Sequence, residues 1–317
     1  MSYKNKQRKV QTAKLHCKLP GLFNNDRGFG NFGDYTNLMF VLQDGKNNLF
    51  AGIVSELCNY FKDNNIAWWG DNEVYPTGHL ISSQIQCLNF LFALRKDADT
   101  VLKLVQLFDS EIEVVLPTIN DTDESYIAFE FTYKNDELLG ETDAGGRRGT
   151  KCTSIDAFII AQKEGKKILI PIEWKYTESY LDGENKALEY RRGDTRQGRY
   201  NKLIENSNQL RDVDDKAGSL YYYEPFYELM RQTLQVEQMV AKGIADDFLH
   251  VVVVPTDNQD LLAANYPFSD KGLEDIWRDA ITDNTKFKLV DSQLVYECIE
   301  KSTQHAALSH YLKKRYY

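Results

Sequence analysis

The clearest hydrophobic pattern in the chain lies in residues 153–178, where two apolar segments flank a short polar one. Residues 154–162 and residues 167–177 are rich in Ile, Phe, Leu and Tyr. The residues between them, 163–166, read Lys-Glu-Gly-Lys. Two apolar runs joined by a short polar segment that contains glycine are typical of a β-hairpin. The pattern therefore predicts two antiparallel strands joined by a tight turn.

The position of the turn also predicts which residues face each other across the hairpin. A turn centred between Glu164 and Gly165 places Asp156 opposite Glu173, because residues equally distant from the turn pair with each other. Side chains alternate between the two faces of a strand, so Glu173 and Lys175 emerge on the same face. Asp156, Glu173 and Lys175 are therefore expected to lie together on one face of the sheet.

The remaining periodicity predicts an alternation of helices and strands. Helical spacing of apolar residues occurs in residues 49–63, 82–94, 98–108, 195–210 and 225–243. Strand-like patterns occur in residues 111–116, 126–133 and 248–255, and residues 256–317 are expected to be helical. Ser82 is a suitable N-cap and Pro225 a suitable first-turn residue for two of these helices. This order of elements indicates a mixed α/β fold.

The strand predicted for residues 126–133 carries a charge in its apolar centre. Its sequence, YIAFEFTY, alternates so that Phe129 and Phe131 are expected on one face and Glu130 on the other. A charged side chain in such a place is usually paired or functional. Glu130 is therefore expected to be either a third carboxylate beside the hairpin or a rim residue bound to a lysine or arginine.

Two carboxylates that face each other across a hairpin need a positive partner. Their Cβ atoms would lie about 4.5 to 5.5 Å apart, where like charges destabilise a sheet. Mg²⁺ is held by one or two carboxylates together with water and substrate phosphates, so Asp156 and Glu173 are candidate ligands, with Lys175 placed to orient or deprotonate a water. A surface hairpin with a charged outer face would show the same pattern. Pro171 removes a ladder donor, and a bulge there would shift the pairing by one residue.

The letters SID at residues 154–156 and IEWK at residues 172–175 resemble the motif of the PD-(D/E)xK nuclease superfamily. The segments TSIDAFI and IEWKYTE are similar to bacterial restriction-endonuclease-like proteins within it. Over residues 82–255, the resemblance implies a restriction-endonuclease-like core of αβββαβ order, with a mixed central sheet flanked by helices. It also implies hydrolysis of DNA phosphodiester bonds with Mg²⁺ or Mn²⁺ bound at the two acids, and with the backbone carbonyl of Ile172 as a further ligand.

Two details depart from the pattern of the superfamily. Ile155 stands where many members have proline. The first helix of the core often offers a glutamate toward the metal, whereas this chain offers Gln84, Gln86 and Asn89. Glu130 is the candidate to supply the missing carboxylate.

Positive charge gathers on both sides of the hairpin in the sequence. A glycine-rich basic segment, residues 141–154, precedes it, and a basic stretch with interleaved tyrosines, residues 186–202, follows it. Such clusters bind phosphate backbones, and aromatic rings stack on bases; a solvated basic face has the same composition. The residues predicted to contact substrate are Gln84, Arg147, Arg148, Lys151, Arg191, Arg192, Arg196 and Arg231.

Composition narrows the class of protein further. Apolar residues make up 42% of the 317 residues, enough to bury a full core. The net charge of -9 argues against a simple nucleic-acid coat protein, because such domains are usually basic.

Residues 1–21 lack the apolar segment of a secretory signal. No apolar run approaches the roughly 20 residues of a bilayer span, so no membrane partner is expected. Five scattered cysteines without a C-x-x-C pair fit a reducing cytoplasm.

These patterns favour a Mg²⁺-dependent deoxyribonuclease in which the two hairpin acids bind the metal and Lys175 assists the attacking water. Residues 1–81 would form an N-terminal accessory region, residues 82–256 the nuclease-like core, and residues 257–317 a helical C-terminal extension of one compact domain. A homodimer would supply the two active sites that cleavage of both strands often requires. One alternative is a non-catalytic nucleic-acid-binding protein of the same fold. The other is a glycosidase with two carboxyl groups about 5 to 5.5 Å apart, although a lysine beside the acids suits phosphate better than sugar.

Overall fold

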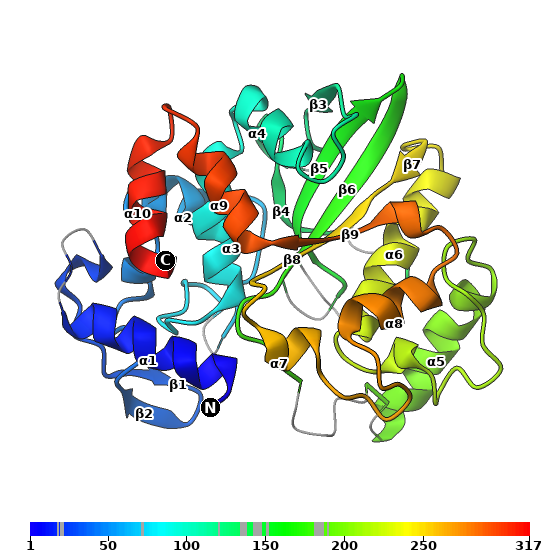
Figure 1. Ribbon diagram of the computed structural model, residues 1–317, viewed down its shortest axis with the longest axis horizontal. Helices are drawn as coiled ribbons and strands as arrows, with labels where there is room; N and C mark the ends of the chain where they lie inside the picture. Colours follow the sequence, from blue (N-terminus) through cyan, green and yellow to red (C-terminus); the bar gives the residue numbers. More distant parts are fainter. Residues whose placement is uncertain are drawn as a thin grey trace.

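A central sheet organises the computed structural model of the chain (Figure 1). The structure describes residues 1–17, 19, 22–70, 73–119, 121–133, 138–141, 148–149, 152–180, 187–188 and 190–317, without the side chains of residues 190–192. Within these residues the main sheet has seven strands of mixed direction, and helices lie on both sides of it. The predicted mixed α/β fold, with a mixed central sheet flanked by helices, is therefore confirmed.

The longest strands of the sheet form the predicted hairpin. They are β5 (Ile155–Lys163) and β6 (Lys166–Trp174). Glu164 and Gly165 form the turn with φ angles of 50° and 75°, and positive φ at both central residues matches the twist of the two strands. The antiparallel pairs follow the predicted register with no shift at Pro171. The turn thus fixes which residues meet at the open end of the hairpin.

Shorter strands extend the sheet on both sides of the hairpin. β3 (Val114–Leu116) and β4 (Ala128–Phe131) pair antiparallel with different parts of β5. β7 (Asp247–Phe248) and β8 (His250–Val254) pair parallel with β6. β8 is buried along its whole length, so its continuous run of valines suits the centre of a parallel region.

A further strand corrects the expectation that residues 256–317 are helical. β9 (Phe287–Asp291) pairs parallel with β8 and forms the other edge of the sheet. Its five residues lie between helical segments, and periodicity alone cannot distinguish so short an apolar run from part of a helix. The C-terminal region therefore contributes to the central sheet as well as to the helical layers.

Two groups of helices cover the sheet (Figure 1). The first group comprises α2 (Val54–Asp63), α3 (Ser83–Leu91), α4 (Ala98–Val105), α9 (Ser292–Glu300) and α10 (Ala306–Tyr316). The second comprises α5 (Tyr190–Glu205), α6 (Phe226–Ala241), α7 (Gln259–Leu262) and α8 (Leu273–Ala280). The helices predicted before residue 256 are present with shifted ends, and Ser82 caps α3 as predicted. No helix in the described part of the chain is long and apolar enough to cross a bilayer.

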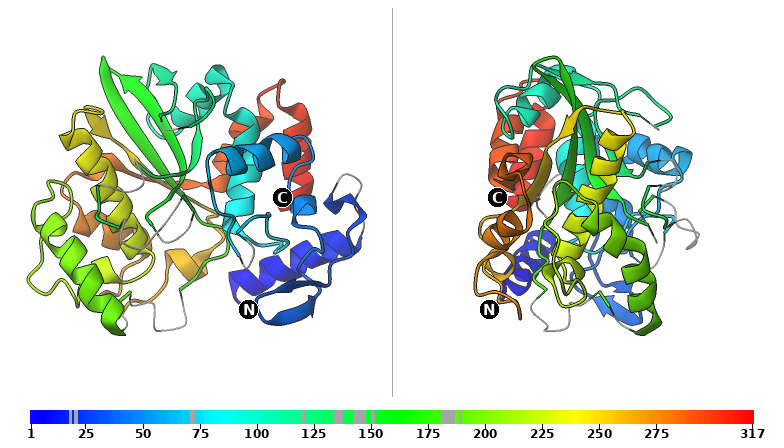
Figure 2. Two further views of the ribbon diagram at one scale, coloured as in Figure 1. Left: turned by 180° about the vertical axis from the view of Figure 1, so that it is seen from behind. Right: turned by 90° about the vertical axis from the view of Figure 1, so that its right-hand side faces the viewer.

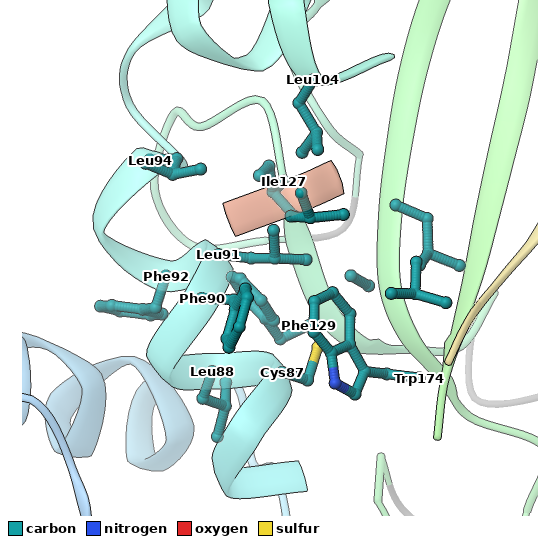
Figure 3. Close-up of a cluster of buried hydrophobic side chains, with 14 of the residues drawn as sticks. Cys87, Leu88, Phe90, Leu91, Phe92, Leu94, Leu104, Ile127, Phe129 and Trp174 are labelled. Atoms are coloured by element: carbon teal, nitrogen blue, oxygen red, sulfur yellow. The ribbon is translucent and has the colours of Figure 1, made fainter. Parts of the chain in front are cut away.

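Helix α3 packs through aromatic side chains against the strands that carry the predicted site (Figure 3). The ring of Phe90 lies 5.1 Å from that of Trp174, and the ring of Phe92 lies 5.5 Å from that of Phe129. The indole N–H of Trp174 donates a hydrogen bond of 2.9 Å to Gln86 Oε1. These contacts fix the ends of β4 and β6 relative to α3.

The N-terminal helix α1 (Tyr3–His16), which the hydrophobic pattern did not predict, packs beside the same end of β6. Gln11 is fully buried and donates from Nε2 to the Arg315 carbonyl (2.9 Å) and to the hydroxyl of Tyr176 (3.2 Å). Figure 2 shows α1 and the small hairpin of β1 (Gly30–Phe32) and β2 (Tyr35–Leu38) at the end of the molecule opposite the β5–β6 turn. The N-terminal segment therefore lies at the open end of the central hairpin.

Candidate functional site

The open end of the central hairpin brings Asp156 and Glu173 together. The regular ladder ends at the pair Ala157 and Ile172. Beyond it, Asp156 Oδ2 accepts a hydrogen bond of 2.7 Å from the backbone N–H of Trp174. Glu173 is only 4% exposed, Asp156 is half-buried, and both line one pocket. The structure therefore places the two predicted acids at one site.

Glu130 joins these acids at a break in the geometry of β4. Its φ is 47°, a left-handed conformation that is uncommon for a residue with a side chain. Phe129 packs on Phe92, whereas Phe131 stacks on Phe158 at 3.9 Å in a different core cluster. The prediction that Phe129 and Phe131 share a face is therefore wrong, because the left-handed residue between them reverses the alternation.

Two side chains hold Glu130 in this conformation. Arg148 donates from Nε to the Glu130 carbonyl (3.1 Å) and forms an ion pair with Asp121 (2.9 Å). Gln84 donates from Nε2 to Glu130 Oε1 (2.6 Å), while its own Oε1 accepts from the backbone N–H of Trp69 (2.9 Å). Arg148 was predicted to contact substrate, but its buried guanidinium is engaged within the fold. The described contacts of Arg148 are therefore internal, and its predicted contact with substrate stays a prediction.

Lys175 is a cation held between two carboxylates. Its Nζ lies 2.7 Å from Glu173 Oε1 and forms a second ion pair with Glu228, in the first turn of α6. It also donates to the hydroxyl of Tyr180 at 3.1 Å. The side chain of Lys175 is only 7% exposed, so these contacts replace most of the hydration of its ammonium group. The three partners fix the position of the charge beside Glu173.

Helix α6 supplies further polar support to the hairpin acids. Gln232 donates from Nε2 to Glu173 Oε2, and its Oε1 lies 3.0 Å from Nε2 of His250. His250 is 1% exposed, as expected for a core histidine whose ring nitrogens have partners. Arg231 donates from Nη1 to the Thr153 hydroxyl at 3.1 Å and lines the same pocket as the acids. One face of α6 therefore orients Glu173 and adds a second positive charge.

The environment of the three acids disfavours their full ionisation. Desolvation, followed by the charges of Glu173 and Glu130, raises the pKa of Asp156 well above its ordinary value. Desolvation also raises the pKa of Glu130 to about 7, and it raises the pKa of Glu173 despite the nearby Lys175. Burial opposes the charge on Lys175, but Glu173 and Glu228 raise its pKa well above the ordinary lysine value. The lysine is therefore cationic at neutral pH, whereas the environment of the acids favours their protonated forms.

These side chains line a pocket of about 970 Å³. The hairpin and α6 contribute to its lining, as do Lys4 and Arg8 of α1 together with Phe32 and Tyr35. Ligand pockets commonly have volumes of about 300 to 1,000 Å³. The site is thus a concave region lined by acids of the hairpin and by basic and aromatic groups of the N-terminal segment.

The donor set fits a hard divalent cation. Oxygen ligands from carboxylates are those that Mg²⁺ prefers, and Glu130, Asp156 and Glu173 provide them. Desolvation, followed by repulsion from neighbouring carboxylates, raises their pKa values, and a bound cation would favour their ionised forms. Over the described ranges of the chain, no group of three or more His, Cys, Asp or Glu side chains is arranged so that it could hold a metal ion, so the three acids do not form a ready-made ligand set. Water and substrate oxygens would therefore have to complete the coordination of a metal.

Besides Arg148, three of the predicted substrate contacts can be located by their side chains. Gln84 and Arg231 line the pocket. Arg196 lies on α5, where it donates to the Ala187 carbonyl and stacks over the ring of Tyr227 at 5.1 Å. The structure thus brings Gln84 and Arg231 to the acids, whereas the described contacts of Arg196 are internal.

The other predicted residues are less directly placed. Arg191 and Arg192 lie in the first turn of α5, and their side chains are not described. Arg147 and Lys151 lie outside the described residues. Ile172 has a fully buried side chain and pairs with Ala157, and the role of its carbonyl as a metal ligand stays a prediction.

Comparison with known families is consistent with this site. A sequence model described as restriction endonuclease associating with ARP (REase-ARP) matches residues 7–317. The chain belongs to this family. No curated protein and no solved structure matches the chain significantly. Membership of the REase-ARP family supports a restriction-endonuclease-like assignment and a nuclease-like role.

Several polar residues of this REase-ARP member were not found from the sequence. Glu228 lies in the first turn of a helix, where an acid commonly complements the helix dipole, so nothing in its sequence position marked it. Glu224 precedes the same helix, and burial followed by the charge of Glu228 raises its pKa to about 8. Tyr180 lies five residues after Lys175, whereas Lys4 and Arg8 reach the site through the long-range packing of α1. The sequence signal for the last two is a basic stretch, residues 1–18, which contains six Lys and Arg residues and no acid.

Proposed function

We propose that this member of the REase-ARP family is a Mg²⁺-dependent deoxyribonuclease of the PD-(D/E)xK superfamily. The observation that carries the proposal is the grouping of Asp156, Glu173 and Lys175 at the open end of one hairpin, with Lys175 Nζ 2.7 Å from Glu173. The order α3, β4, β5, β6, α6, β8 supports an αβββαβ core. The description of the family supports DNA as the substrate.

Each residue of the site would have a distinct role in phosphodiester hydrolysis. Asp156 and Glu173 would hold Mg²⁺ with the backbone carbonyl of Ile172, and Glu130 would be an optional third acid. When bound, the metal polarises the scissile phosphate and acidifies a water. Lys175, kept cationic by Glu173 and Glu228, would stabilise negative charge that develops on the phosphate and orient the attacking water. Gln84 and Gln232 would orient Glu130 and Glu173, and Arg231 would contact a neighbouring phosphate.

The position of Glu130 favours catalysis over the alternative of a binding protein without activity. That alternative depended on the absence of a glutamate from the first helix of the core. Gln84 of this helix instead donates to Glu130 (2.6 Å), so a third carboxylate reaches the site from strand β4. The left-handed backbone of Glu130 and the support from Arg148 are consistent with a position retained for function.

The proposal is tested with Asp156→Asn, Glu173→Gln and Lys175→Ala. Each variant is expected to lose Mg²⁺-dependent cleavage of plasmid DNA by at least about 100-fold, since each removes a metal ligand or the charge beside it. The matched control is Glu124→Gln, which changes an exposed glutamate outside the pocket. Thermal unfolding followed by circular dichroism verifies that all variants are folded.

Metal binding supplies a readout that does not depend on activity. Calorimetric titration with Mg²⁺ or Mn²⁺ is expected to show binding to the wild type and to Lys175→Ala, and strongly weakened binding to Asp156→Asn. Cleavage by a folded Asp156→Asn variant at the rate of the wild type would refute the assignment. Metal binding without cleavage of any DNA substrate would favour the non-catalytic alternative.

A further inference from the structure

Exposed aromatic side chains concentrate in one part of the sequence, and part of that segment lines the acidic pocket. Of the five exposed aromatic residues in the described part of the chain, four come from residues 29–75. They are Phe29, Tyr35, Trp69 and Tyr75. Exposed apolar side chains that gather in one region of a soluble protein usually mark a binding surface. The region next to the candidate active site is therefore a candidate surface for a planar ligand.

Two of these rings belong to the pocket that contains the acids. Tyr35 is 71% exposed and Trp69 is 47% exposed, and both line the pocket together with Phe32 and Phe40. Phe32 stacks on Trp69 with a centroid distance of 5.1 Å and an interplanar angle of 29°. We name Phe32, Tyr35, Phe40 and Trp69 the aromatic wall. It presents large ring surfaces to the same cavity as the candidate metal ligands.

Hydrogen bonds fix the aromatic wall relative to the acids. The backbone N–H of Trp69 donates to Gln84 Oε1 (2.9 Å), and Gln84 donates to Glu130 Oε1 (2.6 Å). The side chain of Gln84 therefore connects the backbone of Trp69 to Glu130, a candidate metal ligand. A base stacked on this wall would therefore lie in the same pocket as the acids.

Positive charge accompanies the rings. Lys4 and Arg8 lie one turn apart on α1 and line the same pocket. The guanidinium of Arg8 lies 4.2 Å from the centroid of Phe40. Rings beside basic side chains match the requirements of single-stranded nucleic acid, whose bases stack and whose phosphates need cations.

The π faces of bases inside a duplex are covered by neighbouring base pairs, so a side chain can stack only on an unpaired, terminal or extruded base. We infer that the aromatic wall stacks an unpaired base, and that the substrate of the proposed nuclease is DNA with a single-stranded segment. The inference rests on the proposed function for the identity of the ligand as DNA. It adds which form of DNA the site accepts.

Binding in the presence of EDTA tests the inference without cleavage. The probe is a fluorescein-labelled DNA strand of about 20 nucleotides, alone or annealed to its complement, followed by anisotropy. The wild type is expected to bind the single strand more tightly than the duplex. Trp69→Ala and Tyr35→Ala are each expected to weaken binding of the single strand by roughly 5- to 100-fold and to change binding of the duplex little.

Two variants serve as controls. Trp69→Phe keeps a ring and is expected to retain most of the affinity for the single strand. Leu294→Ala removes an equally exposed apolar side chain (47% exposed) that does not line the pocket, and it is expected to bind like the wild type. Tyr35 is the more exposed ring, so Tyr35→Ala remains informative if Trp69→Ala reduces the thermal stability.

The possible results separate this inference from the proposed function. Tighter binding of duplex by the wild type, or equal losses for both DNA forms in Trp69→Ala and Tyr35→Ala, would overturn the inference even if the protein cleaves DNA. Tighter binding of the same sequence as single-stranded RNA would overturn the assignment to DNA. A wild type that prefers single-stranded DNA but never cleaves it would refute only the proposed function.

Discussion

Replacing Glu130 by glutamine removes one negative charge from the buried cluster and retains an oxygen that can accept the hydrogen bond from Gln84. Glu130 is only 7% exposed. Desolvation, together with the charge of Glu173, raises the pKa of its carboxyl group from 4.5 to about 7. The folded state therefore disfavours the ionised form of Glu130. We expect Glu130→Gln to be more stable than the wild type at alkaline pH in the absence of metal.

The sign and size of this effect follow from the shift in pKa. Between pH 4.5 and 7 the unfolded chain releases the proton of Glu130 while the folded protein retains it, so the free energy of unfolding falls as pH rises. Above pH 7 the loss is complete and amounts to about 3 kcal/mol, since each pKa unit corresponds to about 1.4 kcal/mol. Removing the charge also relieves Asp156 of one repulsive neighbour.

Urea unfolding in EDTA at several pH values between 5 and 9, followed by tryptophan fluorescence, measures the difference. Glu130→Gln is expected to exceed the wild type by up to about 3 kcal/mol at pH 8.5 and by much less at pH 5. Glu124→Gln removes an exposed glutamate and serves as the matched control for loss of a charge. Its free energy of unfolding should follow that of the wild type within about 0.5 kcal/mol.

Equal stability of Glu130→Gln and the wild type at pH 8.5, or a constant difference across the pH range, would refute the argument from charge repulsion. Addition of Mg²⁺ provides a second comparison. If Glu130 helps to hold the metal, millimolar Mg²⁺ should stabilise the wild type at pH 8.5 more than Glu130→Gln.

Three further predictions concern residues around the site. Arg148→Ala is expected to destabilise the protein by about 3 to 5 kcal/mol in urea unfolding, because it leaves the buried carboxylate of Asp121 without its ion pair; a loss below about 1 kcal/mol would contradict this. Gly165→Val is expected to cost about 1 to 2 kcal/mol through its positive φ alone, with Mg²⁺ affinity unchanged by calorimetry, since no atom lies within 4 Å of an added Cβ. Burial lowers the pKa of His250 from 6.5 to about 3, so the folded protein loses stability as pH falls below 6.5. His250→Gln is therefore expected to lose less stability than the wild type between pH 6.5 and 4, and the exposed His310→Gln is its control.

The central hairpin and its acids could be predicted because local rules determine them. A tight turn at Glu164 and Gly165 and the two-residue period of a strand suffice to bring Asp156, Glu173 and Lys175 to one end. Glu130 could be singled out because a charge is conspicuous in an apolar strand. Its left-handed backbone could not, since nothing in the local sequence requires a glutamate to adopt that conformation.

Residues that reach the site through long-range packing could not be predicted from local sequence patterns. Arg148 belongs to a glycine-rich basic segment whose composition suits a phosphate-binding loop, but the buried Asp121 and the carbonyls of β4 engage its guanidinium. Lys4 and Arg8 reach the pocket because Gln11 anchors α1 against the far end of the chain. Such contacts depend on the assembled fold and leave no periodic signal in the sequence.

The candidate site concentrates features that oppose stability. Glu130 has a strained backbone conformation, typically unfavourable by about 1 to 3 kcal/mol. The site also contains three acids with raised pKa values. Beside them lies Lys175, a buried cation whose charge is balanced by two carboxylates. Replacing buried charges by well-packed apolar groups is often neutral or stabilising, so packing alone does not account for the cluster. A bound cation beside a phosphate would remove the repulsion among the acids while leaving the lysine charged, and this links the instability of the metal-free site to the chemistry proposed for it.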